Sequence, residues 1–321
     1  TLQKERWGRS HIHETIIMVV AMHQIKRWYL MLSGKSVWHV NQDIGKCFLK
    51  DEIKGYYNNM TEKVTKVPEL LNSDELPKLN LEGGKFTFFP VAIFQYGLGA
   101  YDLYLQTHDE RYVRKFMQCV DWAIEHEDEK GRWNNFSHYC PETPYSAMAQ
   151  GEGASLLIRA YKYTGKTDYL NAAKKALAFM LLPLTDRGTS KYEGDDIYLM
   201  EYTFKGMVMN GSIFSWWGLY DYVLVSKDEG IYKKIMERTL QTLIKVLPMF
   251  KCTYWSMYSM DGLIASPFYH NLHIAQMQAM YELTGEPIFD EYAKCWERQQ
   301  KNPICKGLAF IKKSIQKILE K

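Results

Sequence analysis

Hydrophobic residues recur at intervals of three and four positions over most of the chain, which is the period of an amphipathic α-helix. The segment "GEGASLLIRAYKYTGKTDYLNAAKKALAFML" shows this pattern on both sides of a short polar turn. Its apolar positions are Leu156, Leu157, Ala160 and Tyr161 before the turn and Leu170, Ala173, Leu177 and Met180 after it. The pattern predicts a hairpin of two helices that share one buried face.

This hairpin plan occurs four times, with the polar turns "THDERY", "TGKTDY", "SKDEGIY" and "TGEPIF" at a period of roughly 60 residues. A single hairpin cannot bury its apolar face alone, so consecutive hairpins are expected to pack against each other. The sequence therefore predicts a mainly α fold. We expect an incomplete (α/α) toroid of repeated helical hairpins with an N-terminal arm and short inter-hairpin strands and loops.

The two ends of the chain depart from the repeat. Residues 16–32 predict a helix, and the polar segment that follows predicts an extended arm. We therefore assign residues 1–80 to an N-terminal helix and arm packed on the toroid, and residues 81–301 to the (α/α) toroid catalytic domain. Residues 302–321 combine lysines with regularly spaced Ile and Leu, which predicts a C-terminal amphipathic helix.

Composition narrows the class of protein. The 321 residues are 46% hydrophobic, and a net charge of +3 from 40 basic and 37 acidic residues does not favour a nucleic-acid-binding protein. Aromatic residues make up 14% of the chain, which suits stacking on sugar rings as well as packing in a core. The apolar stretch "TIIMVVAM" is too short for a membrane span and predicts a buried helix. The six cysteines form no C-x-x-C pair and no zinc spacing, which favours free thiols in a reducing compartment.

The connections between hairpins, at roughly 128–148, 183–208 and 250–270, are rich in Gly, Pro and aromatic residues and should gather at one end of the toroid. The motif "PYSAMAQGEG" opens the second hairpin. Tyr145 and Gln150 in this motif could hydrogen-bond a sugar, although its glycines could equally serve close helix packing.

Two further motifs open the third and fourth hairpins. "YLMEYTFKGMVMNG" contains Glu201, Tyr202 and Lys205, which could be catalytic or a packed Tyr beside solvated charges. "FYHNLH" contains His270 and His273 at a spacing that puts both on one side of a helix. No third ligand accompanies these histidines, so no metal site is predicted.

Five segments together resemble the D-glucuronyl C5-epimerases of heparan sulfate and heparosan, over about residues 50–300. They are "FFPVAIFQYGLGAYD", "YSAMAQGEGASLLIRAY", "EYTFKGMVMNG", "GLYDY" and "FYHNLHIAQM". The resemblance implies a helical toroid that inverts C5 of glucuronate residues within a polymer to give iduronate. The toroid-dominated, bacterial-type form is the closer likeness, because the animal members carry an additional β-rich part.

The resemblance also implies catalytic residues. An E-Y dipeptide of the family matches Glu201 and Tyr202, a tyrosine in an I-Y-D-L-like element matches Tyr258 in "MYSM", and a Y-H-x-x-H-I element matches Tyr269. In the animal enzymes an Arg follows the second element, whereas Asp261 stands there in this chain. The cation that neutralises the uronate carboxylate is therefore unassigned, and the predicted substrate-binding residues are Lys205, His270, His273, Tyr145, Gln150 and Asn210.

The reaction explains why such residues are needed. The C5 hydrogen lies beside a carboxylate, so its removal gives an enolate-like dianion that needs nearby donors or a cation. Two acid/base groups must also act on opposite sides of C5, one removing a proton and one returning it. We expect Tyr258 and Tyr269 to exchange protons with C5, assisted by Glu201 and Tyr202.

Three other functions fit the same motifs. A uronate polysaccharide lyase on the same toroid would share the first proton transfer. A glycoside hydrolase would need two loop carboxylates among Glu142, Glu152, Glu201 and Asp261, and a non-catalytic glycan-binding protein would use the tyrosines for stacking.

The remaining expectations concern partners and location. No cofactor is predicted, since the sequence has no Gly-rich phosphate loop and the enolate chemistry needs none. The predicted partner is a uronate-containing polysaccharide, with no nucleic acid and no membrane span, and a homodimer is left open. A bacterial-type protein would be cytoplasmic, and an animal-type protein would lie in the Golgi or secretory lumen.

Overall fold

The computed structural model describes residues 39–80, 86–227 and 230–319. The helix predicted at 16–32 lies outside these residues, and so does its "TIIMVVAM" stretch. Contacts divide the chain into Thr1–Asn41 and Gln42–Lys321, and the second part contains all the elements described below.

Four consecutive helical hairpins make up most of this part. They are α4 (Pro90–Thr107) with α5 (Glu110–His126), α6 (Ala147–Thr164) with α7 (Thr167–Met180), α8 (Met209–Ser226) with α9 (Ile231–Val246), and α10 (Pro267–Thr284) with α11 (Pro287–Lys301). The first helix of each pair is buried along most of its length, whereas the second is amphipathic. Each first helix ends at a residue with positive φ, where the chain turns back: His108, Gly165, Lys227 or Gly285.

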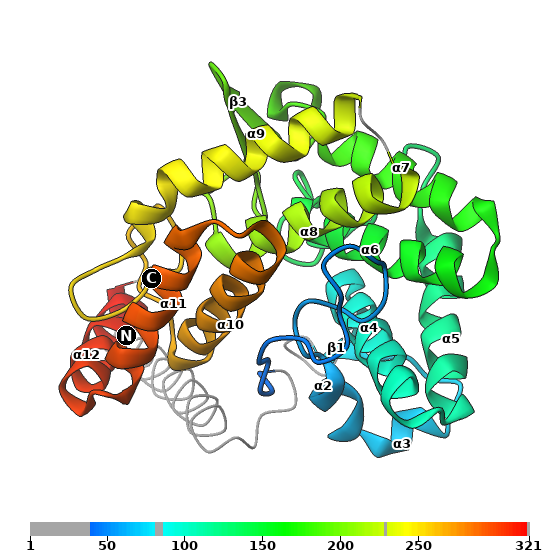
Figure 1. Ribbon diagram of the computed structural model, residues 1–321, viewed down its shortest axis with the longest axis horizontal. Helices are drawn as coiled ribbons and strands as arrows, with labels where there is room; N and C mark the ends of the chain where they lie inside the picture. Colours follow the sequence, from blue (N-terminus) through cyan, green and yellow to red (C-terminus); the bar gives the residue numbers. More distant parts are fainter. Residues whose placement is uncertain (1–38, 81–85, 228–229, 320–321) are drawn as a thin grey trace, which may run out of the picture. The chain divides into compact units, whose positions relative to one another are not determined.

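The buried helices form an inner row and the amphipathic ones an outer row. Helix α4 packs on α6, α6 on α8, and α8 on α10, while each outer helix packs on its own inner partner. Figure 1 shows the hairpins following one another in an arc from α4 to α11. The predicted mainly α fold, an incomplete (α/α) toroid of repeated hairpins, is confirmed.

Because an antiparallel helix separates successive inner helices, the inner helices all run in one direction and begin at the same end. The three long connections, 127–146, 181–208 and 247–266, therefore meet at that end. They contain the short 3-10 helices Leu184–Asp186 and Leu247–Phe250 and the antiparallel ribbon of β3 (Ser190–Glu193) and β4 (Asp196–Leu199). A second ribbon, of β1 (Lys78–Asn80) and β2 (Phe86–Phe88), precedes α4.

The segment 42–60 and the short helix α2 (Thr61–Thr65) pack on the inner row, and the short helix α3 (Pro68–Leu71) contacts α2 and α5. The Tyr57 hydroxyl donates to Oδ1 of Asp221 at 2.5 Å. Arg159 donates through Nη1 to Oδ2 of Asp221 at 2.6 Å and through Nη2 to the carbonyl of Gly55 at 2.8 Å. Since Arg159 and Asp221 lie in the C-terminal halves of α6 and α8, this segment is fixed away from the long connections.

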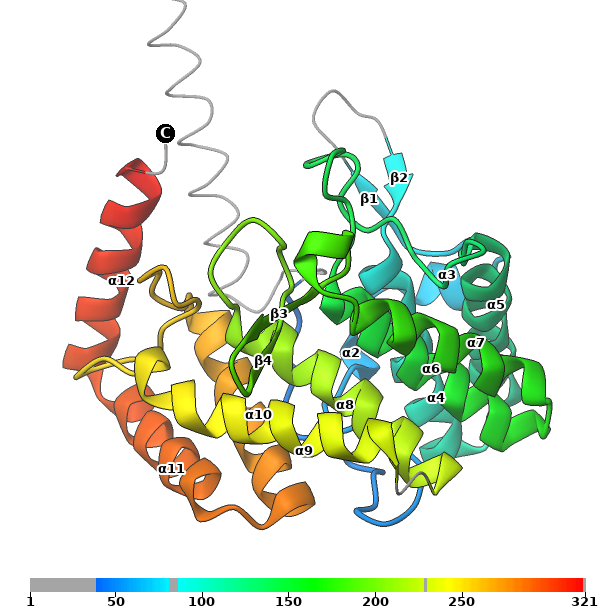
Figure 2. The same cartoon turned by 90° about the horizontal axis from the view of Figure 1, so that it is seen from above.

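The last helix, α12 (Pro303–Leu319), lies beside the connection that precedes α10 (Figure 2). Gln316 donates to the carbonyl of Gly262 at 2.8 Å and accepts from the Ile264 amide at 2.9 Å, and Lys313 donates to the Ile264 carbonyl at 2.9 Å. Within the described residues, every helix is too short or too polar to cross a membrane.

Candidate functional site

Two long connections pair with each other at the common end of the inner helices. The amide of Met209 donates to the carbonyl of Tyr258 at 3.2 Å, and the amide of Met260 donates to the carbonyl of Met207 at 3.0 Å. Val208 and Ser259 form an antiparallel bridge between these bonds. The pairing brings the segment after Glu201 and Tyr202 alongside Tyr258, which lies far away in sequence.

The stretch "MYSMDGLIASPFYHNLH" is a tight hairpin followed by a helix start. Met257 bridges Ile264, and Gly262 supplies the turn with a φ of +82°. Ser266 then caps α10 by accepting from the Tyr269 amide. Tyr269 consequently lies in the first turn of α10, and its ring contacts that of Tyr258 at a centroid distance of 4.7 Å.

Tyr202 joins this pair. Its hydroxyl lies near enough to the side chains of Glu201 and Tyr258 for both to influence its pKa, and its ring stacks on Phe136 at a centroid distance of 4.7 Å. The ammonium of Lys205 lies 4.9 Å from the centre of the Tyr202 ring. The structure thus brings together the three predicted catalytic tyrosines, the predicted carboxylate and one predicted cation.

The Glu201 carboxyl group is buried. Burial raises its pKa to about 7, against the opposing effects of the Tyr202 hydroxyl and the Lys205 ammonium. Its Oε2 atom has no hydrogen-bond partner among the described residues. Burial likewise holds the pKa values of Tyr202 and Tyr258 well above the usual range for a phenol. At neutral pH both phenols are therefore proton donors, and Glu201 is poised to gain or lose a proton.

Gly211, in the first turn of α8, makes room for the Glu201 side chain. A Cβ atom at Gly211 would lie 2.4 Å from Oε2 and 2.7 Å from Cβ of Glu201. Gly211→Ala is therefore expected to displace the carboxyl group and to slow any reaction that depends on it by ~10²-fold, with retention of the fold. Turnover and thermal unfolding measured on the same sample test this expectation.

Gly307→Ala is the matched control for that experiment, because nothing lies within 4 Å of the added methyl group on exposed α12. Alanine there should keep full turnover and slightly stabilise the helix. Equal turnover in both variants would contradict a role for the position of Glu201.

Tyr145 and Gln150 lie in different surroundings from the three tyrosines. The Tyr145 ring packs edge-on against Phe179 at a centroid distance of 5.1 Å, with the Arg132 guanidinium 4.8 Å from its centre. Gln150 is fully buried and donates to the carbonyls of Gly131 at 2.5 Å and Ala176 at 3.2 Å. Gln150 therefore holds a connection onto the hairpins.

The two histidines are also internal. Nδ1 of His270 lies 2.8 Å and Nδ1 of His273 lies 2.9 Å from Oγ of Ser256, and both rings are fully buried. Burial lowers the pKa of His270 to about 3 and that of His273 well below its usual range. Both are neutral at physiological pH, which leaves Lys205 as the predicted cation beside the phenols. No group of three His, Cys, Asp or Glu suited to a metal occurs in the described part of the chain.

Asn210 and Asp261 border the site. Asn210 is nearly buried, its carbonyl accepts from the Gln276 side chain at 3.1 Å, and its Oδ1 has no partner in the residues the structure covers. Oδ2 of Asp261 accepts from the Gly206 amide at 2.7 Å. Asp261 thus fixes the loop that carries Lys205.

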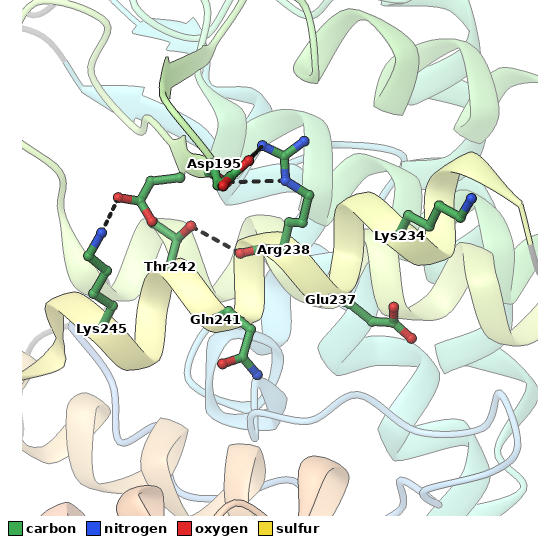
Figure 3. A pocket seen from close by; sticks show the side chains of 8 residues that line it. Asp195, Lys234, Glu237, Arg238, Gln241, Thr242 and Lys245 are labelled. Carbon is green, nitrogen blue, oxygen red and sulfur yellow. Dashed lines mark hydrogen bonds and ion pairs between the residues drawn. The ribbon is translucent and has the colours of Figure 1, made fainter.

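A surface hollow of about 550 Å³ lies beside the outer helix α9 (Figure 3). Its lining comes from the β3–β4 turn and α9: Asp195, Asp196, Lys234, Glu237, Arg238, Gln241, Thr242 and Lys245. Two of the acidic groups there are in ion pairs, since Arg238 lies 3.7 Å from Oδ1 of Asp195 and Lys245 lies 2.6 Å from Oδ2 of Asp196. The hollow contains none of the predicted site residues.

Sequence reasoning missed several residues that shape the site. The ring of Phe136 stacks on Tyr202, and the Ser256 hydroxyl lies between the two histidines. Gly211 leaves room for the Glu201 side chain. Phe136 and Ser256 belong to irregular loops, where neither period nor motif marks a contact. A glycine in the first turn of α8 was a readable signal of a close approach.

Two solved structures with distant likeness to this chain are carbohydrate-active enzymes. Cellobiose 2-epimerase from Spirochaeta thermophila is 8% identical, with 65% of this chain and 57% of that chain aligned and a TM-score of 0.46. A family 76 glycoside hydrolase (mannosidase) from Bacteroides thetaiotaomicron is 16% identical, with 64% and 57% aligned and a TM-score of 0.42.

Sequence relatives are closer. The D-glucuronyl C5-epimerase of Caenorhabditis elegans is 25% identical over 215 residues, which are 58% of this chain and 35% of that protein. An uncharacterized protein of Methanocaldococcus jannaschii is 30% identical over 158 residues, 47% of this chain and 50% of its own length. This chain thus spans half or less of the length of these relatives.

The model of the family described as "D-glucuronyl C5-epimerase C-terminus" matches residues 126–298, more than half of the chain and all of the paired connections. The chain therefore belongs to the D-glucuronyl C5-epimerase family.

Proposed function

We propose that this protein is a C5-epimerase that converts D-glucuronate to L-iduronate residues within a heparosan- or heparan-type polysaccharide. The observation that carries the proposal is the convergence of Tyr202, Tyr258 and Tyr269 with the buried carboxyl group of Glu201. Membership of the family and the name of the Caenorhabditis elegans relative supply the substrate class.

One side of the reaction uses a relay of three groups. A phenolate is costly in a buried site, so Tyr258 can accept the C5 proton only if its own proton moves on. Tyr202 lies between Tyr258 and Glu201 in this relay, and a carboxylate whose pKa is about 7 can receive that proton. The reverse transfer returns a proton to C5 from the same side.

Tyr269 serves the other side. The rings of Tyr258 and Tyr269 are in contact, so a pyranose cannot lie between them. C5 must instead approach the hydroxyl ends of the two side chains, one from each side. A neutral phenol is a competent donor to a strongly basic carbanion, so Tyr269 can protonate C5 to complete the inversion.

Lys205 is the proposed partner of the substrate carboxylate. It lies beside Tyr202 and is exposed, so an anionic substrate can reach it. Charge that develops on the carboxylate during proton removal would be stabilised by this ammonium group. In this chain Lys205 would do what the Arg of the animal enzymes is placed to do, with Asp261 fixing its loop.

The Glu201 pKa sets the pH dependence. Glu201 must be ionised to receive the proton, so kcat/KM is expected to fall about tenfold per pH unit below about pH 7. Glu201→Gln should lower the rate by roughly 10²–10⁴-fold and remove this acid limb, because Gln cannot take up a proton. Measurement of kcat/KM from about pH 5 to about pH 9, for the parent protein and for Glu201→Gln, tests both expectations.

A folded Glu201→Gln protein with the original acid limb would assign the limb to another group. Since the amide keeps the size of the carboxyl group, thermal unfolding of the variant should stay close to that of the parent protein. A large loss of stability would instead mean that Glu201 acts in folding.

Heparosan incubated with the protein in heavy water tests the function as a whole. Deuterium at C5 together with new iduronate, and no shortening of the polymer, is the expected result by NMR. Shortening with a new ultraviolet absorbance would show a lyase instead. The absence of C5 exchange on heparosan and on other uronate polymers would overturn the proposal.

A further inference from the structure

Two large aromatic side chains stand exposed next to Tyr202. Tyr139 is 60% exposed and Phe204 is 45% exposed. Their ring centres are 6.4 Å apart, and Phe204 lies edge-on to Tyr202 at 5.9 Å. The exposed pair is therefore continuous with the candidate active site.

The loop that presents Tyr139 is held in place by the backbone. The amides of Asn135 and Phe136 both donate to the carbonyl of Pro144, at 2.9 and 2.8 Å, and the Cys140 amide donates to the carbonyl of Phe136 at 2.6 Å. Phe136 itself stacks on Tyr202. Tyr139 is thus fixed relative to the catalytic tyrosines, as a binding surface requires.

A cation lies within the same cluster. The Lys205 ammonium is 5.5 Å from the ring centres of both Tyr139 and Phe204, and 3.4 Å from the Tyr139 hydroxyl. Exposed aromatic faces pack on the apolar side of sugar rings, and an ammonium group attracts acidic sugars. The combination matches an acidic glycan better than an apolar protein surface.

We propose that Tyr139 and Phe204 form a subsite for the sugar next to the reacting uronate in the polymer. Lys205 lies between this pair of rings and Tyr202. The proposal rests on the proposed function. While Lys205 binds the carboxylate of the reacting uronate, the neighbouring pyranose packs on the two exposed rings. The subsite fixes the register of the polymer, so that a uronate and not the adjoining sugar meets Tyr258 and Tyr269.

Tyr139→Ala and Phe204→Ala test the subsite. Each is expected to weaken heparosan binding and raise KM about tenfold, while kcat stays within about twofold, because stacking on the neighbouring sugar is uniform binding. Tyr139→Phe keeps the ring and should keep most of the affinity. Tyr281→Ala is the matched control: it removes a 42% exposed ring on α10, whose C-terminal end lies away from the long connections.

Binding is measured by calorimetry on the polymer and needs no catalysis, which separates this proposal from the proposed function. Loss of binding in the two alanine variants alone would support the subsite even if the protein produced no iduronate. Parent-like affinity and KM in both alanine variants would overturn it, even in an active epimerase. Equal loss in Tyr281→Ala, or no binding of any uronate polymer by the parent protein, would overturn it as well.

Discussion

Phenylalanine in place of Tyr269 is expected to slow inversion at C5 by roughly 10³-fold, because the ring stays in contact with Tyr258 while the proposed proton donor of one side is lost. The variant should fold and bind heparosan like the parent protein, since a single hydroxyl is removed from a side chain that is partly exposed. Iduronate formation, followed by NMR, measures the loss.

The same variant should separate proton exchange from inversion. The proposed relay of Tyr258, Tyr202 and Glu201 would still remove and return a proton on its own side. In heavy water, Tyr269→Phe is therefore expected to exchange C5 hydrogen in only one of the two epimers and to form little of the other. Tyr258→Phe should show the mirror image, with exchange confined to the opposite epimer.

Tyr254→Phe is the control, because Tyr254 lies four residues before Tyr258 on the same connection and packs in the same small apolar cluster. Near-normal turnover is expected for it. If Tyr254→Phe lost inversion and Tyr258→Phe did not, Tyr254 would be the phenol that acts. Exchange in both epimers by Tyr269→Phe would exclude Tyr269 as the donor of one side.

The hairpins were predictable because their information is local. Apolar spacing specifies the buried side of each helix, and turns such as the one at Gly165 supply the left-handed residue that ends it. The repeat then fixes the order of the hairpins, and with it the end of the inner row where the long connections meet. Even the assignment of Tyr258 and Tyr269 to one region follows from this order.

The interior of the site was not predictable in the same way. Whether His270 and His273 point toward substrate or inward depends on Ser256, which belongs to an irregular loop. Lys205 lies beside Tyr202 because Asp261, over fifty residues later, holds the Gly206 amide. Such contacts carry no period or fixed spacing, so only the folded chain shows them.

The contacts of segment 42–60 were equally hidden. A packed arm was expected, but no motif indicated that Tyr57 would share the carboxylate of Asp221 with Arg159. Both members of this ion pair have fully buried side chains. A buried pair has little net stabilising value of its own, but it becomes very costly when one member is lost.

Asp221→Ala is consequently expected to lower the free energy of unfolding by about 3–5 kcal/mol. The change leaves the Arg159 guanidinium buried without its counterion and removes the acceptor of the Tyr57 hydroxyl. Urea unfolding followed by circular dichroism measures the loss as a lower midpoint at an unchanged slope. Because the segment is fixed away from the long connections, any protein that remains folded should keep the KM of the parent.

Two comparisons show whether the buried charge is the cause. Asp196→Ala breaks the ion pair between Asp196 and Lys245, whose side chain is exposed on the outer helix α9. This change should hardly alter the urea midpoint. The double variant Arg159→Met, Asp221→Leu should be more stable than Asp221→Leu alone, because it leaves no unpaired charge inside the protein. If the double variant were the less stable of the two, the Arg159 bond to the Gly55 carbonyl, and not the ion pair, would hold segment 42–60 on the toroid.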